Sequence, residues 1–67
     1  MGNKLIETKF DGKKALVIGA KHPHNGAIAV CMGAELVSAL EKYGMRFERI
    51  DTKEQFFVFD GKDVKFI

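Results

Sequence analysis

The sequence has few of the residues that reinforce small proteins. Among 67 residues there is one cysteine, one proline and no tryptophan. A single cysteine, Cys31, cannot form an internal disulfide, and a lone thiol is typical of a reducing compartment, so we expect a cytoplasmic protein. No apolar run approaches the ~20 residues that a membrane-spanning helix needs, and residues 1–4 lack the apolar segment of a signal peptide. We therefore expect no membrane partner.

An excess of one charge is also absent. Eleven Lys and Arg residues oppose nine Asp and Glu residues, which leaves a net charge of +2 with the two signs interleaved. A surface that binds duplex nucleic acid needs concentrated positive charge. The composition thus argues against a dedicated duplex-binding protein, while 46% hydrophobic and 30% charged residues are typical of a folded domain.

The length predicts a single domain, residues 1–67, with a thin core. A chain of this size buries only about 60% of the surface that its unfolded form exposes. Ordering the chain costs on the order of 100 kcal/mol, roughly what such a core returns. With no disulfide available and no convincing metal site, self-association is the remaining way to add buried surface, and we expect a homo-oligomer.

Strand patterns occur at both ends of the sequence. Residues 4–10 and 14–18 are predicted to form two strands joined by a tight turn at Asp11-Gly12, because this pair suits positive φ angles. Residues 15–18 are all apolar, which is typical of a central strand covered on both faces. Residues 45–50, 55–59 and 64–67 predict three more strands, the last two forming a hairpin around Asp60-Gly61.

The segment between these strands predicts a helix from Asn25, a good N-cap, to Gly44, a helix-terminating residue. Its leucines recur at helical spacing, and alanine favours helices over strands. A competing interpretation makes Ala27 to Met32 another strand after an Asn25-Gly26 turn, with a shorter helix from Ala34.

We prefer the long helix, which would connect two parallel strands as a βαβ crossover. The predicted fold class is therefore α/β, more strictly α+β, with the order β-β-α-β-β-β and one helix packed on one face of a mixed sheet. Phe56 and Phe57 are neighbours in a strand and must point to opposite faces. At least one of them should lie on the uncovered face, where a subunit or a ligand would contact it.

The loop IGAKHPHNGAIA, residues 18–29, is the candidate binding site. In the expected fold it leads into a helix N-terminus, where unpaired N–H groups attract anions. Lys21 and protonated His22 and His24 would add positive charge, while Asn25 would cap the helix and Gly26 would let an anion approach the backbone. An ordinary turn with solvated histidines explains the same composition.

Metal binding and catalysis are less well supported. His22 and His24 are the only nearby ligands in the loop, and Cys31 follows on an apolar stretch without a neighbouring base. The spacing matches neither the Walker A pattern nor the dinucleotide pattern. We expect no catalytic residue, no bound metal, no cofactor and no enzymatic activity.

Residues 15–36, ALVIGAKHPHNGAIAVCMGAEL, resemble the first βα unit of the zinc-dependent LmbE/PIG-L deacetylases. His22 and Pro23 match the His-Pro of that family's A-H-P-D-D-E loop, and Cys31 with Gly33 loosely matches its helix. His24, Asn25 and Gly26 stand where the family has two aspartates and a glutamate. The resemblance thus implies a strand-loop-helix unit without zinc hydrolysis.

Three functions fit these observations. The first is a non-enzymatic oligomeric protein that holds an anionic small molecule, and a nucleotide is the ligand we favour. By size and expected architecture alone, the chain is similar to small phage proteins that sequester the cyclic nucleotide signals of bacterial defence. The second is a protein-interaction module or inhibitor that uses an open sheet face or an edge strand. The third is single-stranded nucleic-acid binding through sheet aromatics.

Overall fold

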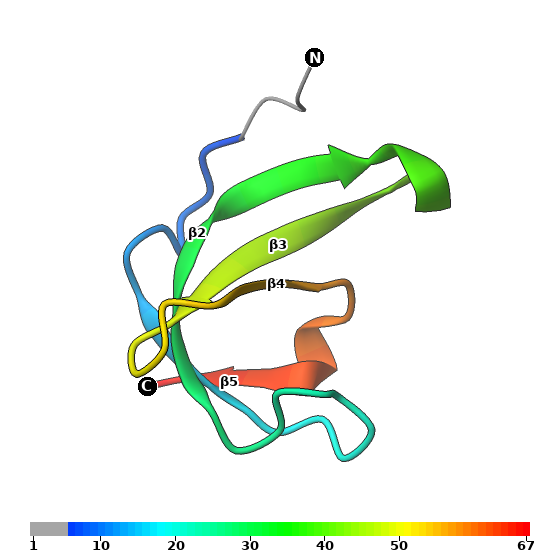
Figure 1. Ribbon diagram of the computed structural model, residues 1–67. Coiled ribbons are helices and arrows are strands. Elements are labelled where there is room, and N and C mark those ends of the chain that lie inside the picture. Colours follow the sequence, from blue (N-terminus) through cyan, green and yellow to red (C-terminus); the bar gives the residue numbers. More distant parts are fainter. Residues whose placement is uncertain (1–5) are drawn as a thin grey trace.

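The protein is a five-stranded antiparallel sheet with no α-helix among residues 6–67, the residues that the computed structural model describes (Figure 1). The strands are β1 (Lys14–Val17), β2 (Ile28–Val37), β3 (Lys42–Arg49), β4 (Gln55–Val58) and β5 (Val64–Phe66). Two 3₁₀-helices of three residues each, η1 (Ser38–Leu40) and η2 (Gly61–Asp63), connect β2 to β3 and β4 to β5. In this range no helix is long and apolar enough to cross a membrane.

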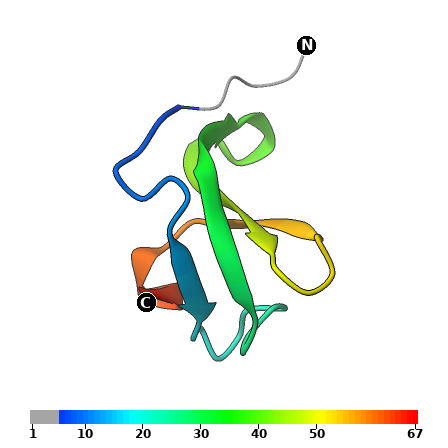
Figure 2. The same cartoon turned by 90° about the vertical axis from the view of Figure 1, so that its left-hand side faces the viewer.

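The strand order is β4-β3-β2-β1-β5, so β2 is the central strand and the C-terminal strand pairs with β1. Figure 2 shows β2 running between its two neighbours. The β2–β3 hairpin is longer than the other strands, and its distal half, with η1 at the tip, projects from the body of the molecule (Figure 1). This projection leaves part of both hairpin faces uncovered.

The predicted α+β fold, with its helix and βαβ crossover, is wrong. Half of the segment assigned to the helix is β2, which pairs antiparallel with β1 on one side and β3 on the other. Small side chains alternate with larger ones along β2, and the small ones face inward: Ala29 and Cys31 are buried against the rest of the core. Two ladders of backbone hydrogen bonds therefore override the helix propensity of alanine.

The competing interpretation, a strand over Ala27 to Met32, was right from Ile28 onward, but no helix starts at Ala34. The strand instead continues through a β-bulge between Cys31 and Gly33, where the register with β3 shifts by one residue. Gly33 takes φ +125, a conformation that L side chains rarely adopt. Gly44, expected to end a helix, lies within β3 opposite Glu35.

Both predicted hairpins are also wrong. Among residues 6–10, only Ile6 pairs with a strand, as an isolated bridge to Ala34; Lys4 and Leu5, which began this predicted strand, lie outside the described residues. The Asp11-Gly12 pair does form a turn. Strands β4 and β5 do not pair with each other, because η2 carries the chain to the opposite edge of the sheet.

The core lies on one face of the sheet around Phe47, which is fully buried. Phe56 and Phe66 pack against it with ring centroids 5.9 Å and 6.1 Å away, and Phe10 stacks on Phe66 at 4.4 Å. Phe57 points to the opposite face, where it contacts Arg46. The prediction that Phe56 and Phe57 lie on opposite faces is confirmed.

Candidate functional site

The loop predicted to bind an anion connects β1 to β2 as an irregular turn. Hydrogen bonds between Val17 and the Gly26–Ala27 backbone close it, and the Asn25 side chain donates to the carbonyl of Gly19 at 2.9 Å. Gly26 has φ +89, as a turn requires. Because no helix starts at Asn25, the predicted array of helix N-terminal amides is absent. The strand-loop-helix unit implied by the deacetylase resemblance is wrong for the same reason.

The two histidines of this loop pack against the sheet. His24 stacks on Phe56 with ring centroids 4.4 Å apart, and His22 meets the same ring edge-on at 5.3 Å. The His22 Nδ1 accepts a hydrogen bond from the backbone N–H of His24 at 3.0 Å, and its Nε2 lies 3.4 Å from the carbonyl of Phe57, on β4. These contacts give the histidines a structural role in closing one end of the core.

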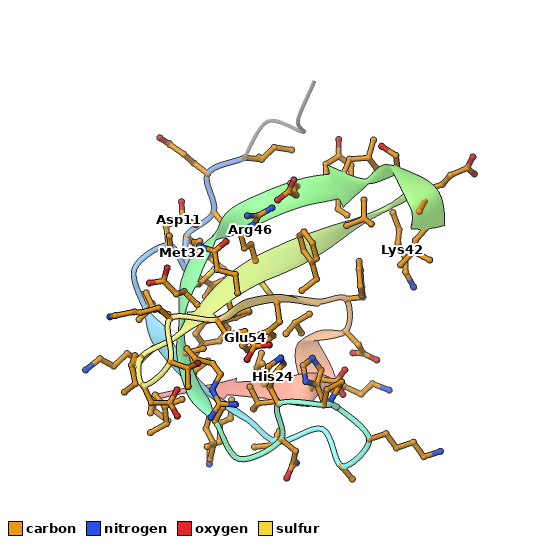
Figure 3. The ribbon with its side chains drawn as sticks, viewed as in Figure 1. Asp11, His24, Met32, Lys42, Arg46 and Glu54 are labelled. Carbon is orange, nitrogen blue, oxygen red and sulfur yellow. The ribbon has the colours of Figure 1, made fainter. Side chains whose placement is uncertain are left out.

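The positive charges near His24 already have acidic partners. Arg49 donates from Nη1 to the His24 Nδ1 at 3.2 Å, and its other nitrogens hold the Asp51 carboxylate at 2.9 Å and 2.8 Å. The His24 Nε2 lies 3.7 Å from the Glu54 carboxylate (Figure 3). An anionic ligand here would have to displace these carboxylates.

The Arg49–Asp51 contact is strong enough to perturb both groups. The hydrogen bonds from Arg49 lower the pKa of Asp51 to about 2, and the same contact raises the pKa of Arg49 above its ordinary value. Arg49 therefore stabilises the β3–β4 turn through its contact with Asp51. Lys21 is exposed, and a binding role for it, as for the other loop residues, stays a prediction.

The described residues contain no group of three or more His, Cys, Asp or Glu side chains that could hold a metal ion. Cys31 is 1% exposed and unpaired in the core. Nor do residues 6–67 enclose a pocket.

A different group of side chains lies on the face of the sheet opposite the core. We call it the aromatic face and define it as Lys42 and Arg46 of β3 together with Phe57 of β4 and the following Phe59. The Arg46 guanidinium lies 5.2 Å from the Phe57 ring centroid, and the Phe57 and Phe59 rings stack at 6.0 Å. Figure 3 shows Arg46 and Lys42 on the long hairpin.

Arg46 is the most constrained residue of the aromatic face. It forms an ion pair with Glu35 across the β2–β3 ladder and donates to the side chain of Gln55 at 2.8 Å. Its Nε is buried and has no hydrogen-bond partner among the described residues. Glu35 is only 6% exposed, so the bridge lies beneath the surface that Arg46 presents.

Phe59 lies over Gly44. A Cβ at residue 44 would come within 2.7 Å of the ring, which means that only glycine leaves room for this placement. The Lys42 Nζ lies 5.1 Å from the centroid of the same ring. Phe59 remains 39% exposed and is available to a partner.

Sequence reasoning singled out Phe57 but missed the rest of this face. The available signal was the period-two alternation of residues 28–34, in which Ile28, Val30 and Met32 alternate with alanine, cysteine and glycine. Treating this segment as a strand would have given β3 a partner, but the bulge that brings Glu35 to the face of Arg46 does not follow from the alternation.

Comparison of this chain with known proteins gives no relative from which a function could be transferred. No protein-family model, no curated protein and no solved structure matches it.

Proposed function

We propose that this protein is a non-enzymatic protein-interaction module that contacts a protein partner through its aromatic face. The observation that carries the proposal is the Arg46 guanidinium over the Phe57 ring, beside the exposed ring of Phe59. Arginine and aromatic residues are enriched in the cores of protein interfaces and among the residues that contribute most of the binding energy.

The rigidity of Arg46 supports this assignment. An arginine on a free surface loses side-chain entropy when a partner immobilises it, at about 0.5–1.5 kcal/mol. Glu35, Gln55 and the Phe57 ring already restrain Arg46, so less entropy remains to be lost on binding.

The charges suggest the chemistry of the partner. Glu35 already pairs with Arg46, whereas Lys42 forms no ion pair with any of residues 6–67. A complementary surface would place an apolar side chain on Phe59 and a carboxylate near Lys42. The proposed partner is thus a protein segment with an apolar residue next to an acidic one.

Binding of an anionic small molecule, which the sequence favoured, is not the function we propose. Its physical basis was a helix N-terminus, and the corresponding segment is a turn followed by a strand. We also propose a reducing compartment, the cytosol, because Cys31 is an unpaired core thiol.

Affinity capture with matched variants tests the proposal. The immobilised full chain is exposed to an extract, captured proteins are identified, and each is then titrated directly. Phe59→Lys should abolish binding of the true partner, and Gly44→Ala should weaken it by displacing the ring without removing a side chain. Leu40→Ala is the control, because Leu40 is 53% exposed at the hairpin tip, outside the aromatic face.

Equal binding by all these variants would contradict the proposal. Salt-sensitive binding of a single-stranded oligonucleotide, lost in Phe59→Lys, would instead assign this face to nucleic acid.

A further inference from the structure

A second group of side chains lies on the same outer face of the sheet as the aromatic face, toward the other end of β3, and carries apolar residues across three neighbouring strands. Leu16 of β1 pairs with Ile28 of β2, and the backbone N–H of Ile50, just after β3, donates to the Ile28 carbonyl at 3.1 Å. We call Leu16, Ile28 and Ile50 the apolar row. Ile28 is 36% exposed and Ile50 is 43% exposed. Large apolar residues that are gathered and exposed on one face usually mark an interface.

The sequence pattern of β1 agrees with a covered surface. Residues 15–18 are all apolar, as expected for a strand that is buried on both sides. Within one chain only the inner side is covered: Ala15 and Val17 are buried, while Leu16 is half-buried and Ile18 is 46% exposed. The outer side of β1 therefore lacks the cover that its composition predicts.

Charged residues flank the central strand next to this row. Val30 of β2 pairs with Lys14 of β1 on one side and with Glu48 of β3 on the other. By the alternation of strand side chains, all three lie on the outer face. Lys14 and Glu48 are two strand spacings apart, close to 10 Å, and do not form an ion pair within one chain.

We infer that the apolar row is the interface of a homodimer in which two sheets pack face to face around a two-fold axis parallel to β2. Such an axis exchanges the two sides of β2. It therefore places Lys14 of each copy opposite Glu48 of the other while the apolar rows cover each other. Aligned packing of two sheets is a common arrangement in β proteins, and an isologous interface uses the same patch twice.

The positions of these charges favour a second copy of this chain as the partner that covers the apolar row. A lysine and a glutamate placed symmetrically about the central strand make the surface complementary to itself, and each dimer gains two intermolecular ion pairs. The interface also supplies the extra buried surface that a chain of 67 residues needs.

Sedimentation velocity at concentrations from about 10 to 500 μM tests the inference, since interfaces of modest area associate in the micromolar range or more tightly. Wild-type protein should dimerise, and Ile28→Lys should weaken dimerisation at least tenfold. Leu40→Lys, which changes an exposed apolar residue at the distant hairpin tip, should leave it unchanged. Circular dichroism checks that each variant is folded.

Charge reversal gives the sharper test. Lys14→Glu and Glu48→Lys should each weaken dimerisation, because each creates two like-charge contacts. An equimolar mixture of the two variants should form a heterodimer with two ion pairs, one in the original orientation and one reversed. The double variant should dimerise again as a homodimer with both pairs reversed.

A wild-type protein that stays monomeric throughout the range overturns the inference. Dimerisation that is insensitive to Ile28→Lys, or a mixture that fails to associate, overturns it as well. Both groups lie on the outer face, so the two proposals are told apart by their variants: Ile28→Lys changes self-association, whereas Phe59→Lys changes binding of the protein partner.

Discussion

Gly44 lies directly beneath the ring of Phe59, so that a single added methyl group at residue 44 would come within 2.7 Å of the ring edge. This relationship lets the Phe59 ring lie close to the β3 backbone, stacked with Phe57.

Gly44→Ala should displace the Phe59 ring with little loss of stability. The ring is 39% exposed and free to swing outward, and alanine is better than glycine in a strand by about 0.5–1 kcal/mol. The expected change in the free energy of unfolding is below about 1 kcal/mol, measured by urea denaturation. Side-chain NMR shifts of Phe59 should change clearly; unchanged shifts would contradict the ring's placement over Gly44.

His24→Ala should destabilise the protein by about 1–2 kcal/mol. It removes a ring stacked on Phe56 and the acceptor of the Arg49 hydrogen bond, each typically contributing about 0.5–1.5 kcal/mol. Lys21→Ala in the same loop should change stability by less than about 0.5 kcal/mol, because Lys21 is exposed. Similar losses in the two variants would show that His24 does not anchor the loop.

Asp51→Asn should destabilise the protein in a pH-dependent way. The pKa of Asp51 is about 2 in the folded state, below the ordinary value near 3.9, so its ionised form stabilises the fold above about pH 4. This stabilisation is lost as the pH falls through 2. The difference in stability between wild type and variant should therefore be present at pH 6 and vanish near pH 2; because Asp51 is exposed, salt should reduce it.

Gly33→Ala should destabilise the protein by about 1–3 kcal/mol, because φ +125 at the bulge is strained for any residue with a side chain. Gly12→Ala, at φ +79 in an exposed turn with open space around it, is a useful comparison. We expect Gly33→Ala to be the more damaging change in thermal unfolding, because residue 33 is buried and fixes the β2–β3 register. A smaller effect at residue 33 would indicate that the bulge can relax.

Much of the local structure follows from the sequence. The apolar run at residues 15–18, the alternation after Gly44 and the paired phenylalanines each specify extended backbone through side-chain pattern alone, and the structure contains strands at all of these places. The opposite orientation of Phe56 and Phe57 follows from strand geometry, which depends only on neighbouring residues.

The candidate site was harder to predict from the sequence. Lys21, His22 and His24 were correctly placed in a loop after β1. The partners of the two histidines are not near them in sequence, because Arg49, Glu54 and Phe56 come from β3, the turn after it and β4. The Arg46–Glu35 pair likewise depends on the register of β2 against β3, which the bulge at Gly33 shifts by one residue.

By itself, then, the sequence determined where the chain is extended at β1, β3, β4 and β5 and which side chains of β4 face apart, because these are properties of local pattern. Only the tertiary structure decided that the alanine-rich segment is β2 and that β5 pairs with β1 rather than β4. Helix propensity differs among residues other than proline by no more than about 1 kcal/mol, whereas hydrogen-bond ladders to β1 and β3 and the burial of Ala29 and Cys31 act together on β2. Pairing between strands distant in sequence is a property of the whole sheet.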